Sequence, residues 1–267
     1  MSLAVISAII MTVLLIVMLV MGASISIAIG LSSAVAMLCM LPVDISLITS
    51  AQRIFTGANS FSLIAIPFFI LAGNIMNNGG IAVRLVNVAK VLSGRMPGAL
   101  AQSNVVANMM FGAISGSGAA AAAAIGGTMG PLEEQEGYDK VFSTAVNIAS
   151  APTGMLIPPS NLMIVYSTVA GSVSVAALFV AGYVPGILWG IGVMALVAYF
   201  AKKKGYVSEE RVDLKTALHV IVDAIPSLLL IVIIIGGILG GVFTATEGSA
   251  IAVVYATVLS LIYKNIK

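Results

Sequence analysis

Two short stretches carry the residues of this chain that could bind a ligand. The first, which we call the tip, is Ser115-Gly116-Ser117-Gly118, and a run of alanines follows it. It offers backbone carbonyls, serine hydroxyls and the N–H groups that open the next helix. Such N–H groups suit a carboxylate, whereas carbonyl and hydroxyl oxygens suit a sodium ion, so the tip could bind both. The alternative is a loop that only lets two helices pack closely.

The second stretch, which we call the break, runs from Pro152 to Asn161 and also contains Pro158 and Pro159. Each proline lacks a backbone N–H, so the carbonyl that it would have bonded stays free to bind a cation. A single proline usually makes only a kink, whereas these three favour a true unwinding of the helix. The other polar or flexible residues of the break are Thr153, Gly154, Ser160 and Asn161.

The rest of the chain is strongly apolar. Of its 267 residues, 60% are hydrophobic and 8% are charged, against about a quarter charged in soluble domains. This composition predicts an all-α polytopic protein of the lipid bilayer with little mass outside it. The net charge is only +2, with the basic residues in loops, which gives no footprint for nucleic acid. One cysteine and one histidine exclude an internal disulfide and a Cys/His metal cluster.

Interrupted helices are costly in such a protein, because lipid cannot satisfy their open backbone groups. They persist only where they are buried in protein or line a hydrated cavity. Two of them, separated by one polar loop, indicate a transporter binding site built from the ends of half-helices.

The apolar runs predict a series of membrane spans, of which one is interrupted by the break. Asp44 and Arg53 fall in a polar connection, and Ile81–Leu92 reads as an amphipathic helix at the interface, with Ile81, Leu85, Val88, Ala89 and Leu92 on its apolar face. The expected spans are 3–21, 24–41, 62–76, 141–170, 173–200, 217–239 and 248–263.

The tip lies between two apolar arms, 99–114 and 119–129. The second arm is too short to cross a bilayer at about 1.5 Å per residue, so we expect a re-entrant hairpin over 99–130. The loop Lys202–Lys215, which includes Arg211, is the most basic of the chain and is therefore expected in the cytoplasm. Counting spans from this loop places the hairpin base on the same side and the amino terminus outside. The acidic residues of that base, expected to be solvated, are Glu133, Glu134, Glu136 and Asp139.

Four polar residues near the apolar segments have two interpretations each. Asn104, Asn108 and Asn147 could line a transport path or hold helices together. Glu247 could be a functional intramembrane acid, but its place at the start of the last span favours a helix cap.

These features divide the chain into three parts. Residues 1–98 hold the N-terminal spans and the interfacial helix, residues 99–200 hold the hairpin and the broken helix of a transport repeat, and residues 201–267 hold the basic loop and two further spans.

Several motifs resemble the large membrane subunit of the tripartite ATP-independent periplasmic (TRAP) transporters, in that family's order. They are Ile66–Gly73, Gly112–Ser117 with its alanine-rich arm, Ala151–Gly154 with Ile157–Ser160, and Phe243–Glu247. The resemblance implies an elevator-type ion-transporter fold in the inner membrane of a bacterium or archaeon. It also implies sodium-coupled uptake of an organic acid, such as a C4-dicarboxylate or sialic acid. The implied partners are a small membrane subunit and a periplasmic substrate-binding protein.

The resemblance also assigns roles within the tip and the break. Substrate is expected at Ser115, Gly116, Ser117, Gly118, Pro158, Pro159, Ser160 and Asn161, and sodium at Ser115, Ser117, Pro152, Thr153 and Gly154. Family members carry a second, inverted repeat with its own hairpin and break, whereas this chain shows one such set. We therefore expect that the chain is truncated or that the other half is a separate polypeptide.

The sequence gives less support to three other functions. An intramembrane protease would need a nucleophile with a base or two membrane aspartates, and His219 and Asp223 have no such partner in a recognisable arrangement, so no enzyme is expected. A channel-like protein would normally pair two re-entrant half-helices in one chain. An inactive permease fragment remains the third alternative.

Overall fold

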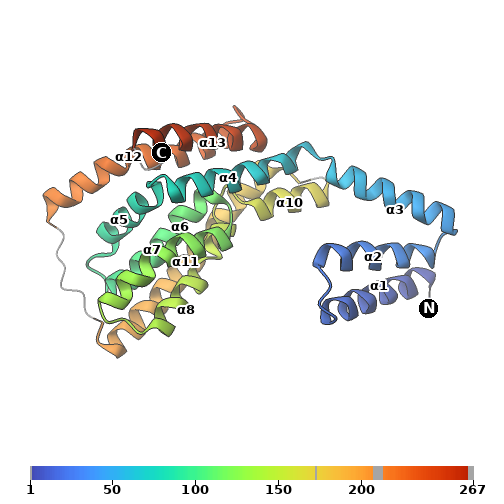
Figure 1. Ribbon diagram of the computed structural model, residues 1–267, viewed down its shortest axis with the longest axis horizontal. Helices are drawn as coiled ribbons and strands as arrows, with labels where there is room; N and C mark the ends of the chain where they lie inside the picture. Colours follow the sequence, from blue (N-terminus) through green and yellow to red (C-terminus); the bar gives the residue numbers. More distant parts are fainter. Residues whose placement is uncertain (1, 172, 207–212, 264–267) are drawn as a thin grey trace. The chain divides into compact units, whose positions relative to one another are not determined.

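The computed structural model describes residues 2–171, 173–206 and 213–263, where the regular secondary structure is helical throughout (Figure 1). The chain forms two compact units, Met1–Ser60 and Phe61–Lys267. The expected all-α class is therefore confirmed. Among the described residues, five helical segments are long and apolar enough to cross a membrane, and a bent helix pair makes a sixth.

The first unit holds α1 (Leu3–Val20), α2 (Ile25–Leu38) and α3 (Val43–Ala58). The helix α2 has 14 residues and ends at Leu38, before the predicted limit of that span, and a short turn leads from it to Pro42. The predicted polar connection is wrong, since α3 forms there. Pro42 is the N-cap residue of α3, where its missing N–H breaks no helical hydrogen bond, and Asp44 in the first turn lies at the positive end of the helix dipole.

In the second unit, η1 (Phe61–Ile64) and α4 (Ala65–Asn78) are followed by α5 (Ile81–Ser93). The chain ends in α12 (Leu214–Leu239) and α13 (Ala245–Ile262), and α4 runs beside α13 (Figure 1). The helix α5 lies against α6 and α12. Its predicted apolar residues are buried except Leu92, which is 58% exposed, so α5 turns its apolar face to other helices.

The centre of this unit is the helical hairpin of α6 (Ala99–Ser115) and α7 (Gly118–Gln135). The second arm continues through Pro131, which costs one helical hydrogen bond without ending the helix. Its 18 residues span about 27 Å, so the arm is longer than the predicted 119–129. Even so, α7 is not among the helices of the described chain that are long and apolar enough to cross a membrane. The positions of its two ends show whether the hairpin returns to the side from which it starts.

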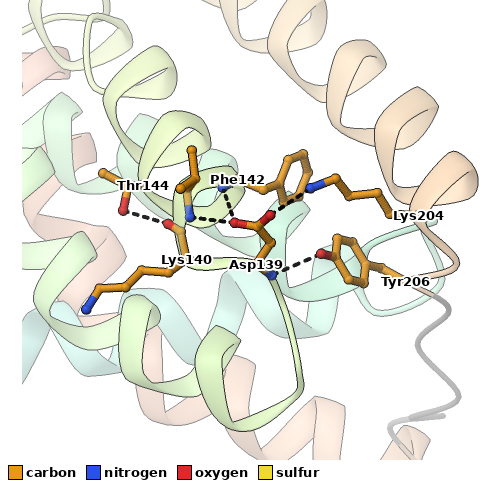
Figure 2. A network of polar contacts seen from close by, with 7 residues as sticks. Asp139, Lys140, Phe142, Thr144, Lys204 and Tyr206 are labelled. Atoms are coloured by element: carbon orange, nitrogen blue, oxygen red, sulfur yellow. Dashed lines mark hydrogen bonds and ion pairs between the residues drawn. The ribbon is translucent and has the colours of Figure 1, made fainter.

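Both ends of the hairpin meet the end of α11 (Val175–Lys204). The N–H of Gly98, before α6, donates to the Tyr206 carbonyl at 3.1 Å. After α7, the N–H of Asp139 donates to the Tyr206 hydroxyl at 2.9 Å, and the Lys204 ammonium pairs with the Asp139 carboxylate at 3.1 Å (Figure 2). The Tyr138 and Tyr206 rings stack with centroids 4.4 Å apart. The hairpin therefore begins and ends on one side, beside Lys204.

The Asp139 contacts carry a pH-dependent prediction. The hydrogen bond from Lys204, helped by the N–H groups of Val141 and Phe142, holds the Asp139 pKa below its ordinary value of 3.8. A carboxyl with a lowered pKa stabilises the fold above that ordinary value and loses the effect as pH falls through the folded pKa. Asp139 caps α8 (Lys140–Ser150), and Asp139→Asn keeps a capping side chain but loses the charge. In thermal unfolding in detergent, the wild type should be more stable than Asp139→Asn at neutral pH, and the gap should close well below pH 3.8.

If the wild type remained more stable than Asp139→Asn well below pH 3.8, the charge of Asp139 would not be the cause of the difference. Lys204→Gln is the matched control, since it removes the same ion pair from the α11 side.

Candidate functional site

The tip joins the two arms of the hairpin. Helix α6 ends at Ser115, and Gly116 has a φ of +62°, a left-handed conformation that suits glycine. Ser117 then caps α7, its hydroxyl accepting from the Ala120 N–H at 3.3 Å. The predicted interruption at the tip is present.

The break interrupts the next span in the same manner. Helix α8 (Lys140–Ser150) gives way to one turn, α9 (Thr153–Leu156), and α10 (Asn161–Ala170) leaves at a bend of 46°. Ser160 caps α10 with φ and ψ of −130° and 121°, close to the −136° and 118° of Ser117. The predicted break in this helix is confirmed, and two helices begin from serine caps of similar geometry.

The tip and the break contact each other, which the sequence did not predict. The N–H of Asn161 donates to the Gly116 carbonyl at 3.1 Å, and its side-chain amide donates to the Ser115 carbonyl at 3.4 Å. The Asn161 Oδ1 atom is buried without a partner among the described residues. The start of α10 is therefore held directly against the end of α6.

Glycines allow this contact. A Cβ atom on Gly112 would lie 2.2 Å from the Gly154 Cα, and one on Gly118 would lie 2.9 Å from the Ala151 carbonyl. Real Cβ atoms do not approach so closely, so the two backbones touch. Ser115, Thr153 and Ser160 are fully buried at this junction.

The predicted ion ligands differ in whether their oxygen atoms already accept a hydrogen bond. The Pro152 carbonyl accepts from the Met155 N–H at 3.0 Å, so its oxygen is already hydrogen-bonded. The Thr153 hydroxyl donates to the Ser150 carbonyl at 2.6 Å, which leaves its oxygen able to accept or to ligate. The tip and the break therefore contribute the buried hydroxyls of Ser115, Thr153 and Ser160, an oxygen chemistry suited to a small cation.

The asparagines join the hairpin to α8. Asn108 donates to the side-chain oxygens of Asn104, Asn147 and Ser150, each at 2.9 Å. Asn147 in turn donates to the Ala122 carbonyl at 2.8 Å. These bonds tie three helices together, so a packing role is observed, while Asn104 and Asn147 also line a cavity near the hairpin base.

Glu133 corrects the expectation of a solvated hairpin base. Its side chain is fully buried and accepts from the Asn104 amide at 3.2 Å. The sequence did hold a signal, since Ile125, Met129 and Glu133 are spaced four apart and share one face of α7, and all three are buried. Glu134, Glu136 and Asp139 are exposed.

Glu247 is a helix cap, as favoured from the sequence. Its carboxylate accepts from the N–H and the hydroxyl of Thr244, both at 2.8 Å, and the Thr244 hydroxyl accepts from the Glu247 N–H. This reciprocal arrangement is a capping box at the start of α13.

Comparison with known proteins finds a family and relatives that match most of the chain. Residues 12–267 match the family model described as the tripartite ATP-independent periplasmic transporter, DctM component. The chain is 56% identical over 250 residues to the uncharacterized protein YgiK of Salmonella typhimurium, covering 94% of this chain and 58% of that protein. It is 41% identical over 255 residues to the C4-dicarboxylate TRAP transporter large permease protein DctM of Vibrio cholerae, covering 95% and 56%.

A third relative is the sialic acid TRAP transporter large permease protein SiaM of Vibrio cholerae, 37% identical over 216 residues, covering 81% of this chain and 50% of that protein. The chain therefore spans about half the length of the curated relatives that it matches.

Proposed function

The chain belongs to the DctM family of TRAP transporter large permeases, a family of transporters and not of enzymes, and from this we propose its specific function. We infer that it is part of a secondary active permease that takes an organic acid into the cell together with sodium. Relatives named for C4-dicarboxylate and for sialic acid support a carboxylate substrate.

The observation that carries this proposal is the direct contact between the tip and the break. Two helices, α7 and α10, begin at that junction from serine caps. Helix starts carry partial positive charge and free N–H groups that favour a carboxylate. The neighbouring hydroxyl and carbonyl oxygens favour sodium, so the two ligands would bind side by side.

The proposed roles follow this chemistry. The substrate carboxylate is assigned to the tip and to the Pro158–Asn161 segment. Sodium is assigned to the oxygens of Ser115 and Ser117 in the tip and of Thr153 and Gly154 in the break. Pro152 stays in this set only as the start of α9, because its carbonyl is already bonded.

Partners and orientation are part of the same proposal. The family implies a small membrane subunit and a periplasmic binding protein, and an elevator-type transport cycle in the inner membrane. The lysines at the end of α11 support a cytoplasmic location for that end, and the hairpin base is bonded to it. Counting spans keeps the amino terminus outside. Arg211, part of the basic loop, lies outside the described residues.

Uptake into proteoliposomes tests this function. The permease containing this chain joined to a second repeat, the small subunit and the cognate binding protein would be assayed with radiolabelled C4-dicarboxylate and sialic acid. We expect uptake of one of them under an inward sodium gradient and none when potassium replaces sodium. Equal uptake in both salts would fit a channel-like protein and contradict the proposal.

A further inference from the structure

A cavity of about 500 Å³ lies among α6, α7 and α8, toward the base of the hairpin. Small residues of α7, such as Gly126 and Gly127, form one wall, and no residue of the tip or the break lines it. Its polar lining includes Asn104, Glu133, Ser143 and Asn147.

The cavity contains a buried carboxyl group with an open oxygen. Glu133 is fully buried, and one of its oxygens accepts from Asn104. Its Oε2 atom has no hydrogen-bond partner among the described residues. Among the described residues, one ion pair joins Arg84 to Asp223 and another joins Lys204 to Asp139. Neither of them neutralises Glu133. A buried carboxylate without a counter-charge is costly, which calls for a positive charge in the cavity.

A second open oxygen lies beside the first. The Ser143 hydroxyl of α8 is buried without a partner among the described residues, and it is close to the Glu133 carboxyl without meeting hydrogen-bond geometry. Asn104 and Asn147 line the same cavity, and each side-chain oxygen accepts one hydrogen bond from Asn108 and keeps a second lone pair. One carboxylate with several neutral oxygens is a ligand set for a hard cation of single charge.

Two other charged residues line the cavity, but neither is buried as Glu133 is. Lys140 and Glu134 line the same cavity, and both are exposed at its rim. No group of three or more His, Cys, Asp or Glu residues in the described chain could hold a metal ion. Ligands for zinc, or for a divalent ion needing several carboxylates, are therefore not gathered here.

We propose that this cavity is a binding site for a sodium-sized alkali cation, held by Glu133 Oε2 and the Ser143 hydroxyl. The site is separate from the tip and the break. It joins them through a row of buried polar groups, from Glu133 through Asn104 and Asn108 to Ser150, whose carbonyl accepts from Thr153. A cation here would hold the second hairpin arm against α8, whether or not the chain transports.

Equilibrium binding of radioactive sodium to the purified chain in lipid nanodiscs tests the site, with choline chloride holding ionic strength constant. Glu133→Gln should lower the number of sodium ions bound per chain by one. Ser143→Ala should weaken that site by about tenfold or more. The matched control is Glu134→Gln, which removes a charge from the rim of the same cavity and should leave binding unchanged.

Circular dichroism and gel filtration would establish that each variant is folded, and Ser143→Ala carries the test if Glu133→Gln is not. Unchanged sodium binding in folded Glu133→Gln, or loss of binding in Glu134→Gln, would overturn the site. Infrared spectra separate sodium from a proton. We expect added sodium at constant pH to leave no protonated-carboxyl band attributable to Glu133. A band that persists in sodium and is absent in Glu133→Gln would mean that the positive charge is a proton, and would also overturn the proposal.

Discussion

Replacing Gly116 by valine, in the chain joined to a second repeat, should abolish sodium-driven uptake. Gly116 has a φ of +62°, and a Cβ atom there would lie 3.0 Å from the Pro159 carbonyl oxygen and 3.1 Å from the Asn161 nitrogen. A branched side chain would therefore push the break away from the tip, besides straining the backbone. Proteoliposome uptake measures the loss, and expression and membrane insertion should be unchanged.

The matched control is Gly137→Val, in the turn after α7. Gly137 also has a positive φ, of +79°, but nothing lies within 4 Å of its added Cβ. This variant bears the same kind of backbone strain without disturbing the junction, so it should retain most of the uptake. Wild-type uptake by Gly116→Val, or an equal loss in both variants, would show that the tip need not lie against the break.

The second large effect concerns the length of the chain. This 267-residue chain alone should show no sodium-driven uptake, whereas the same chain extended by a second repeat should transport. The aligned part of this chain covers only 50% to 58% of its matched relatives. In inverted-repeat transporters the substrate sits between the two halves, each of which supplies a hairpin and part of the ion ligands. With one tip and one break, the far side of the substrate would have no protein wall.

The measurement is uptake by the short and extended forms at equal amounts in the membrane. Substantial uptake by the short form as a monomer would contradict the prediction. Uptake only by an antiparallel dimer would mean that another copy supplies the second half.

Local chemistry made the interruptions predictable from sequence. Gly116 and the prolines of the break restrict or release the backbone whatever surrounds them, so both positions could be placed before the structure was known. The capping box at Thr244 and Glu247 is likewise a short-range pattern. In contrast, the contact of Asn161 with Ser115 joins residues 46 apart and depends on how two helices pack.

Two predictions were wrong because each relied on charged residues alone: the connection at Asp44 and Arg53, and the exposure of Glu133. Asp44 and Arg53 suggested a connection, yet two charges do not prevent a helix when Pro42 starts it and no glycine interrupts it before Gly57. Glu133 belongs to the same acidic run as its exposed neighbours, although its spacing from Met129 puts it on the buried face of α7. Its burial depends on Asn104 of another helix, which no local pattern reveals.

The central proposal is that the α6–α7 hairpin enters and leaves the membrane from the cytoplasm, with its tip against the break. Cysteine labelling tests this most directly, after the single native Cys39 is replaced by serine. Cysteines introduced singly at the exposed positions Glu134 and Lys203 would be treated with an impermeant reagent on right-side-out and inside-out vesicles. Both should be labelled only from the cytoplasmic face. Labelling of position 134 from the periplasmic face would contradict the hairpin and, with it, the proposed site.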